Sequence, residues 1–197
     1  MIPGTIDVRV AKASEHDAVL NTLMLAFSTD PCLRFILDTP DKFFKAFRPF
    51  ATGMGGAGVA AGTAWLADDG AAAALWLPPG TESDRDAMLG VLVELVDPAK
   101  LPTVAEVGEA MAQYHPEEPH WYLAMIGVDP AQQGRGYGSA ILKESVRRCD
   151  EEGVLAYLES SNPKNVPLYE RHGFEVMGHV APGDFPGLYP MIRRPRG

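Results

Sequence analysis

The sequence predicts an α/β fold, and three observations support that class. Residues 121–158 read strand, helix and strand in succession, which is the pattern of a βαβ unit with two parallel strands. Two further strand-like segments, 63–66 and 71–77, flank an Asp-Gly turn and predict an antiparallel hairpin. Segments with 3.6-residue apolar spacing lie on either side of the hairpin, so strands and helices alternate along the chain.

Length and composition favour a single globular domain. The chain has 197 residues, of which 46% are hydrophobic, and this is enough to form a core without disulfide or metal staples. Lys and Arg number 17 against 26 Asp and Glu, a formal charge of −9 that repels nucleic-acid phosphates and anionic lipid. Cys32 and Cys149 lie far apart without metal-ligand spacing. We therefore expect no nucleic-acid partner, no metal and no disulfide framework.

The sequence also shows no segment that would direct the chain into or across a membrane. The first residues carry no basic run followed by an apolar stretch. The most apolar region, 58–79, is interrupted by Asp68-Asp69-Gly70 before it reaches the length of a membrane span. We expect a cytoplasmic protein without a membrane partner.

The first half of the chain predicts one strand and several helices. Residues 5–10 alternate as a strand does, and a helix of about three turns follows, with Ser14 as its expected N-cap and Asp30-Pro31 as its end. The aromatic-rich residues 33–50 predict shorter helices separated near Pro40, with their aromatic side chains, including Phe44, in the core.

Two more helices are expected between the hairpin and the βαβ unit. Residues 83–96 and 103–114 carry apolar stripes at helical spacing. Ser83 and Thr103 are each followed three residues later by an acid, a pattern typical of N-caps. After residue 158 we expect a short helix over 165–172 and strands over 174–180 and 188–193. The expected organisation is one domain over 1–197 with a helical insertion around 83–115.

The most specific signal is the glycine-rich loop between the first strand of the βαβ unit and its helix. It reads Gln133-Gly134-Arg135-Gly136-Tyr137-Gly138-Ser139 and enters the predicted helix 136–152. Three glycines in five residues remove side chains that would obstruct a ligand, and the first N–H groups of a helix have no partner within it. This arrangement favours a phosphate group.

Two familiar nucleotide loops do not match it. A Walker loop ends in Gly-Lys-Ser/Thr, whereas this loop ends in Gly-Tyr-Gly-Ser, with no lysine before Lys143. A dinucleotide-binding fingerprint needs a third glycine where this chain has Ser139 or, in the other alignment, Ile141. The pattern that does match is Gln/Arg-x-x-Gly-x-Gly/Ala, met by residues 133–138.

From Trp121 to Gly178 the chain resembles the GNAT superfamily of acetyl-CoA-dependent N-acetyltransferases. The resemblance rests on segments in family order and spacing: Val128-x-Pro130, the glycine loop, Asn162 and Leu168-Tyr169-Glu170-Arg171-His172-Gly173-Phe174. Within the superfamily it is most similar to the puromycin-type antibiotic acetyltransferases. The resemblance implies the GNAT (acyl-CoA N-acyltransferase) fold, a central mixed, mostly antiparallel sheet with helices on both faces.

The resemblance also implies how acetyl-CoA is held. The strand 121–128 is expected to splay from the next strand, so that the backbone amides of Ile126 and Val128 bind the pantetheine arm like an added strand. Main-chain N–H groups of the loop would hold the pyrophosphate, with Arg135 pairing to it at the surface. Asn162 would hydrogen-bond the pantetheine, although an Asx-turn ahead of Pro163 is the alternative. The expected cofactor-binding residues are Ile126, Val128, Gln133, Gly134, Arg135, Gly136, Tyr137, Gly138, Ser139 and Asn162.

Two side chains are the candidates for proton transfer. The resemblance places Tyr169 at the departing thiol of CoA, and a phenol with a pKa near ~10 can donate a proton to a thiolate whose acid has a pKa near ~8.5. Strand 121–128 contains no acid; Glu118, His120 and Glu159 flank it, and Glu159 at the end of the following strand is our first choice for the general base. His16, His115, His172 and His179 are read as surface or packing residues.

The predicted activity is transfer of an acetyl group from acetyl-CoA to a primary amine of a small molecule, by direct attack in a ternary complex. Two alternatives stay open: a protein or peptide N-acetyltransferase, and a non-catalytic acyl-CoA-binding sensor. The sequence does not identify the acceptor or the length of the acyl group, and it leaves a homodimer open.

Overall fold

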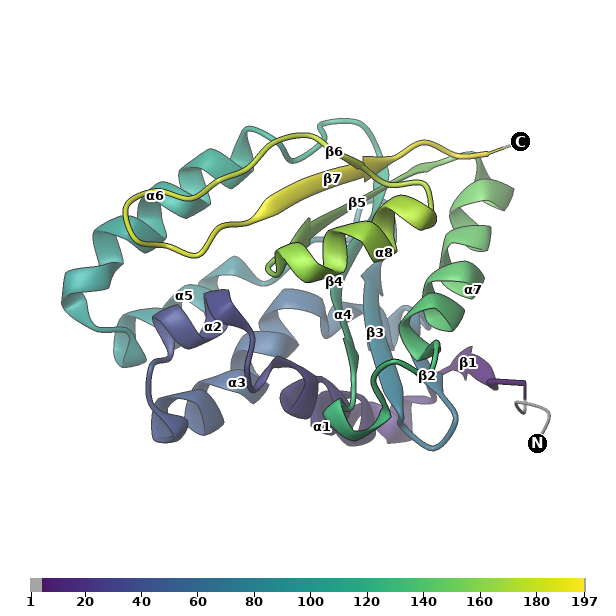
Figure 1. Cartoon of the computed structure of the whole chain (residues 1–197), viewed down its shortest axis with the longest axis horizontal. Helices are drawn as coiled ribbons and strands as arrows, with labels where there is room; N and C mark the ends of the chain where they lie inside the picture. The colour runs from purple at the N-terminus through teal and green to yellow at the C-terminus, as the bar shows by residue number, and fades with distance from the viewer. Residues whose placement is uncertain (1–4, 197) are drawn as a thin grey trace.

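The structure is a computed structural model that describes residues 5–196, and its centre is a seven-stranded mixed sheet (Figure 1). The strands lie in the order β1-β2-β3-β4-β5-β7-β6, and every neighbouring pair is antiparallel except β4 and β5. The strands are β1 (Val8–Val10), β2 (Ala64–Ala67), β3 (Ala72–Leu77), β4 (His120–Val128), β5 (Leu155–Ser160), β6 (Glu175–Val176) and β7 (Tyr189–Arg193). This is the predicted GNAT fold.

Helices cover both faces of the sheet, as expected. The helices are α1 (His16–Phe27), α2 (Pro31–Ile36), α3 (Pro40–Gly55), α4 (Ala57–Ala60), α5 (Arg85–Leu95), α6 (Leu101–Ala112), α7 (Tyr137–Glu152) and α8 (Val166–Arg171). One core cluster joins α1, α2, α3 and α5 to one face of the sheet, and a second joins α7 and α8 to the other face. Among residues 5–196, no helix has both the length and the apolar character needed to cross a bilayer.

The hairpin and the βαβ unit form where the sequence predicts them. β2 and β3 pair antiparallel around a turn in which Asp68 and Gly70 take positive φ angles of 45° and 91°. β4 and β5 pair in parallel on either side of α7, whose inner face buries Ile141 and Leu142 completely. Burial of that apolar face fixes α7, and therefore the loop at its N-terminus, against the sheet.

Several local expectations were wrong, and the helix starts account for most of them. Ser14 lies within a 3-10 turn, and α1 begins at His16. α5 is capped by Asp84, whose carboxylate accepts a hydrogen bond from the Ala87 N–H, while Ser83 donates to the Met54 carbonyl. Thr103 lies inside α6, which begins at Leu101. Of these three helices only α5 has a side-chain cap, because Glu15 before α1 and Lys100 before α6 make no capping hydrogen bond.

The remaining corrections concern Asp30, Phe44 and the last strands. Asp30 does not end α1; it caps α2 through a bond from the Leu33 N–H, and Pro31 takes the first helical position. Phe44 is 62% exposed, because it lies on the outer side of α3. The expected strand over 174–180 is reduced to the two residues of β6 and one isolated bridge at Val180.

Candidate active site

β4 and β5 separate partway along their length, and this opening, here called the fork, is the centre of the site. They pair from His120 opposite Leu155 to Leu123 opposite Leu158, and β4 then continues alone on this side as far as Val128. On its other side β4 stays paired with β3, with a register shift that leaves Ala124 as an extra residue at the point of separation. The bulge and the fork therefore begin together (Figure 1).

The backbone amides of Ile126 and Val128 face into the fork. The Asp129 N–H donates to the Ala71 carbonyl at 2.9 Å, so Asp129 points toward β3. Successive residues of a strand alternate their N–H groups between its two edges, which turns Gly127 toward β3 and Ile126 and Val128 toward the open side. The fork thus offers the unpaired strand edge that an extended ligand could join.

The glycine loop, Gln133–Ser139, lies where β4 leads into α7. Gly134 and Gly136 have φ angles of 76° and 92°, a conformation that glycine adopts without steric cost, and Gly136 is the N-cap of α7. The N–H groups of Tyr137, Gly138 and Ser139 begin the helix and have no acceptor within it. They form a set of converging donors at the positive end of the helix dipole.

Gly138 joins the loop to the other cofactor-side elements. A Cβ atom built at Gly138 would lie 3.4 Å from Leu168 on α8 and 3.5 Å from Val128 on β4. The start of α7, the end of β4 and the helix that carries Tyr169 therefore meet at one point. The structure thus brings Leu168, the residue before Tyr169, against the glycine loop and the end of β4, about 30 to 40 residues earlier in the sequence.

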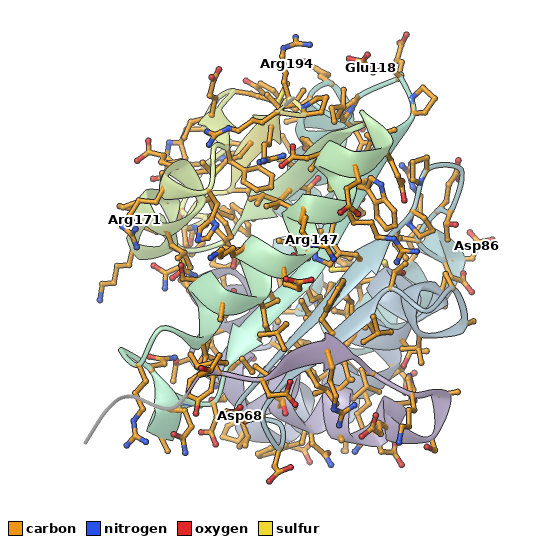
Figure 2. All side chains as sticks on the ribbon, turned by 90° about the vertical axis from the view of Figure 1, so that its right-hand side faces the viewer. Asp68, Asp86, Glu118, Arg147, Arg171 and Arg194 are labelled. Atoms are coloured by element: carbon orange, nitrogen blue, oxygen red, sulfur yellow. The ribbon has the colours of Figure 1, made fainter. Side chains whose placement is uncertain are left out.

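Side chains of the loop are held by neighbours that sequence reasoning did not identify. Arg135 is exposed and donates to Gln132, and Gln133 reaches back toward the Val128 carbonyl. The Tyr137 hydroxyl donates to Asp68 at 2.8 Å, and this bond raises the pKa of Tyr137 above its ordinary 10.0. Asp68 lies in the β2–β3 turn, so the hairpin helps to fix the helix start (Figure 2).

Ser139 is paired with His172, which the sequence placed among the surface or packing residues. The Ser139 hydroxyl lies 2.8 Å from His172 Nε2, and the imidazole is partly buried at the end of α8. Burial lowers the pKa of His172 below 6.5, and the nearby charges of Arg171, Arg193 and Arg196 lower it further. His172 thus ties the end of α8 to the first turn of α7.

Tyr169 is buried next to the fork, and its ring packs edge-on against Phe174. Burial raises the pKa of the phenol well above 10.0, and the negative charge of Asp30 raises it further. The hydroxyl therefore keeps its proton across the physiological range, but the raised pKa also makes it a weaker acid than an ordinary phenol.

Glu159 is the first β5 residue beyond the last β4–β5 pair, and it lies on the sheet face opposite α7. The hydroxyls of Tyr157 and Tyr122 donate to its carboxylate at 3.2 and 3.4 Å. Burial raises the pKa of Glu159 above 4.5, whereas these two hydrogen bonds act in the opposite direction. Solvent still reaches part of the side chain, so the carboxylate can exchange a proton with a ligand.

Two histidines complete this group: His120, one of the three groups that flank strand 121–128 in the sequence, and His115, which the sequence placed among the surface or packing residues. The ring of His115 packs edge-on against Tyr122 and Tyr157, and His120 packs against Tyr157. We name Glu159, Tyr122, Tyr157, His115 and His120 the recess. His115 lies just beyond α6 and His120 at the start of β4, so no local motif could have linked them to β5.

The expected pantetheine ligand Asn162 lies just after β5. Its side-chain oxygen accepts a hydrogen bond from the Lys164 N–H, in the Asx-turn geometry that the sequence offered as an alternative. A bond to pantetheine would therefore use the carboxamide nitrogen.

Neither cysteine has the properties of a nucleophile. Burial raises the pKa of Cys32 and of Cys149 to about 12, so both remain thiols at neutral pH. Within the described residues, no group of three or more His, Cys, Asp or Glu side chains is arranged to hold a metal ion.

Comparison with known proteins agrees with this geometry. The model of the Acetyltransferase (GNAT) family matches residues 102–174, the segment that contains β4, the glycine loop, α7, β5 and Tyr169. An uncharacterised N-acetyltransferase of Schizosaccharomyces pombe is 27% identical over 180 residues, covering 83% of this chain and 72% of the relative. The chain is an acyl-CoA-dependent N-acetyltransferase with the GNAT fold.

Solved structures extend the match over nearly the whole acetyltransferase. A Corynebacterium glutamicum structure described as histone acetyltransferase HPA2 and related acetyltransferase covers 98% of both chains, with a TM-score of 0.71 and 26% identity. Arylalkylamine N-acetyltransferase 2 from Aedes aegypti shares the fold at a TM-score of 0.67 and 14% identity. A mycothiol acetyltransferase of Propionibacterium freudenreichii is 30% identical over 108 residues, which is 50% of this chain and 35% of that protein.

Proposed function

We propose that this acetyltransferase moves an acetyl group from acetyl-CoA to a primary amine of a small molecule, by direct attack in a ternary complex. The observation that carries the proposal is the fork. β4 extends beyond its last pair with β5, presents the amides of Ile126 and Val128 to the opening, and ends at the glycine loop and the N-terminus of α7. This is an extended backbone edge leading to a cluster of phosphate-binding donors.

The residues present fit a CoA thioester. An extended pantetheine arm would pair with Ile126 and Val128, and the N–H groups of Tyr137, Gly138 and Ser139 would bind the pyrophosphate. Gln133, Gly134, Arg135 and Gly136 shape this loop, and Asn162 offers its amide nitrogen from the β5 side. When bound, acetyl-CoA supplies the activated acyl carbon and a thiolate leaving group.

The chain's own residues would then position the reactants and move protons. Glu159 would take a proton from the amine on the face opposite α7, and Tyr169 would give its proton to the departing sulfur. Holding both reactants in attack geometry can lower the barrier by about 7 to 11 kcal/mol, whereas acid or base catalysis contributes ~10²- to 10⁴-fold each. Positioning by the fork is therefore the larger contribution.

The acceptor is proposed as a small amine for two reasons. The relatives include mycothiol acetyltransferases, and chains with the same fold include an agmatine and several arylalkylamine acetyltransferases. The sequence around Leu158-Glu159-Ser160-Ser161 and Asn165–Arg171 also resembles the puromycin-type subgroup, so aminonucleosides belong among the candidates. We further propose that the protein acts in the cytoplasm.

The test is acetyl-CoA-dependent release of CoA with a panel of alkylamines, arylalkylamines, amino sugars, aminonucleosides and peptides. Release with at least one small amine, and none with peptides, supports the proposal. Release only with peptides would replace it with a protein N-acetyltransferase. Tight acetyl-CoA binding without transfer to any member would replace it with a non-catalytic sensor.

A further inference from the structure

The recess places an uncompensated negative charge at the edge of the fork. In the described part of the chain, no Lys, Arg or His nitrogen lies within 4.0 Å of the Glu159 carboxylate. Its only hydrogen-bond donors there are the two phenols, which are neutral. A buried carboxylate without a cation is costly, so a ligand that supplies the cation gains that energy on binding.

The groups around the carboxylate do not neutralise it. His120 Nδ1 lies 2.8 Å from the Glu118 carbonyl, so this nitrogen carries a proton and donates it to the carbonyl, and the Nε2 atoms of His120 and His115 lie 3.1 Å apart. Burial lowers the pKa of His115 below 6.5, so this imidazole adds no positive charge at neutral pH. Arg85 lies beyond ion-pair distance but its positive charge acts on both Glu159 and His115, whereas Glu82 acts on His115.

The walls of the recess are aromatic as well as anionic. The rings of Tyr122 and Tyr157 are 5.9 Å apart and tilted by 32°, and both histidine rings pack edge-on around them. Tyr122, His115, His120 and Glu159 each keep partial solvent exposure. Aromatic faces beside a carboxylate are the chemistry that binds an ammonium ion.

The recess also lies on the face of the sheet opposite α7, so it leaves the glycine-loop side free for acetyl-CoA. Leu123 and Leu158 pack with α7, and residues alternate along each strand, so Tyr122, Tyr157 and Glu159 occupy the opposite face. A ligand in the recess and a thioester reached from the glycine loop would approach the fork from different faces without competing for space.

We propose that the recess is the acceptor subsite and that it selects amines that arrive as ammonium ions, held by Glu159 and the tyrosine rings. This rests on the proposed function and narrows it: alkylamines, which are cations at neutral pH, are substrates, and neutral aromatic amines are not. Glu159 acts first as the counter-ion. The proton then moves from the bound ammonium to the carboxylate, which leaves the neutral amine at the fork.

The test uses two probes of the same shape, choline and 3,3-dimethyl-1-butanol, which differ in the positive charge and cannot be N-acetylated. Their dissociation constants are measured by calorimetry with CoA present. We expect the wild-type protein to bind choline at least tenfold more tightly than the neutral alcohol, because only choline gains the ion pair and the cation–π contacts. Glu159→Gln should abolish this preference while it keeps the shape of the side chain.

The control is Glu152→Gln, which removes the same charge from the α7 side, where Glu152 accepts a hydrogen bond from Trp121. It should keep the preference for choline. Equal binding of the two probes by the wild-type protein, or a preference that survives in Glu159→Gln, would overturn the subsite. Acetyl transfer to the amine panel is measured in parallel: transfer without the cation preference refutes the subsite alone, whereas the preference without any transfer refutes the proposed activity and leaves the subsite standing.

Discussion

The two sides of the fork are built in different ways. On the proposed acyl-CoA side, the end of β4, the glycine loop and the first turn of α7 form one continuous segment, and the groups proposed to bind the ligand are backbone amides. On the acceptor side, the recess takes His115 from beyond α6, Tyr122 from β4 and Tyr157 and Glu159 from β5. A binding site built from backbone groups can be recognised from a local sequence motif. A binding site built from side chains of several elements is assembled only by the tertiary fold.

Ion pairs on the two faces of the sheet also differ in burial. On the α7 face, Arg193 of β7 is 2% exposed and makes a two-pronged pair with Asp150 of α7 at 2.7 and 2.8 Å. On the face of α2 and α3, Asp38 pairs with Lys42 and Lys100 at the surface. Arg147 lies on the outer side of α7, where it pairs with Glu144 and Glu151 (Figure 2).

The largest effect is expected from Asp150→Ala, which leaves a buried guanidinium without its partner and should lower the free energy of unfolding by about 3 to 5 kcal/mol. Asp38→Ala, the matched surface change, should cost about 1 kcal/mol or less. Urea denaturation measures both. Equal losses of unfolding free energy would show that the buried and the surface ion pair contribute equally to stability.

The pH dependence of that stability gives a further check. Arg193 lowers the pKa of Asp150 below its ordinary 3.8, so the pair stabilises the folded state above that value and the contribution is lost as the pH falls through the folded-state pKa. The difference in stability between wild type and Asp150→Ala should therefore shrink at acid pH. A difference that grows on acidification would contradict the assignment.

The next effect concerns the proton donor. Tyr169→Phe keeps the ring packed against Phe174 but removes the hydroxyl, so kcat should fall roughly 10- to 10³-fold while acetyl-CoA affinity stays nearly unchanged. Steady-state kinetics and calorimetry give the two numbers. Wild-type kcat in a folded variant would mean that water or another group protonates the leaving sulfur.

A smaller effect is expected in the pH dependence of kcat/KM, which tests Glu159 as the general base. Because burial holds the pKa of Glu159 above 4.5, kcat/KM should fall about tenfold per pH unit below that pKa, as the base becomes protonated. In Glu159→Gln this acid limb should disappear. Its kcat/KM should then rise with pH only where the free amine loses its own proton. An unchanged acid limb in Glu159→Gln, with Glu152→Gln as the control, would assign the base elsewhere.

The sequence predicted the local geometry of the glycine loop far better than the arrangement of the recess, for physical reasons. Glycine at positions 134 and 136 indicates a turn with positive φ angles from residue type alone, and the βαβ pattern fixes where the loop lies. The roles of His115 and His120 could not be predicted, because each depends on α6 ending beside β4 and β5. The link from His172 to Ser139 depends likewise on the contact between α8 and α7.

The residue that caps each helix could also not be predicted from the sequence, although the helices themselves were predicted. Asp84 and not Ser83 caps α5, because Ser83 is turned toward the Met54 carbonyl of α3. Phe44 and Phe47 look alike in the sequence, yet one is 62% exposed and the other is buried. The two side chains point in directions about 60° apart around the helix, and only packing against the sheet determines which of them faces the core.

The central claim is that the backbone at the start of α7 binds acetyl-CoA, and a pair of glycine variants tests it most directly. Gly136 and Gly153 cap the two ends of the same helix, with φ angles of 92° and 67°. Valine at either position imposes similar backbone strain, but only Gly136→Val distorts the N–H groups at the loop. Calorimetry should show acetyl-CoA binding weakened at least tenfold in Gly136→Val and unchanged in Gly153→Val. Equal affinities in the two folded variants would contradict the account.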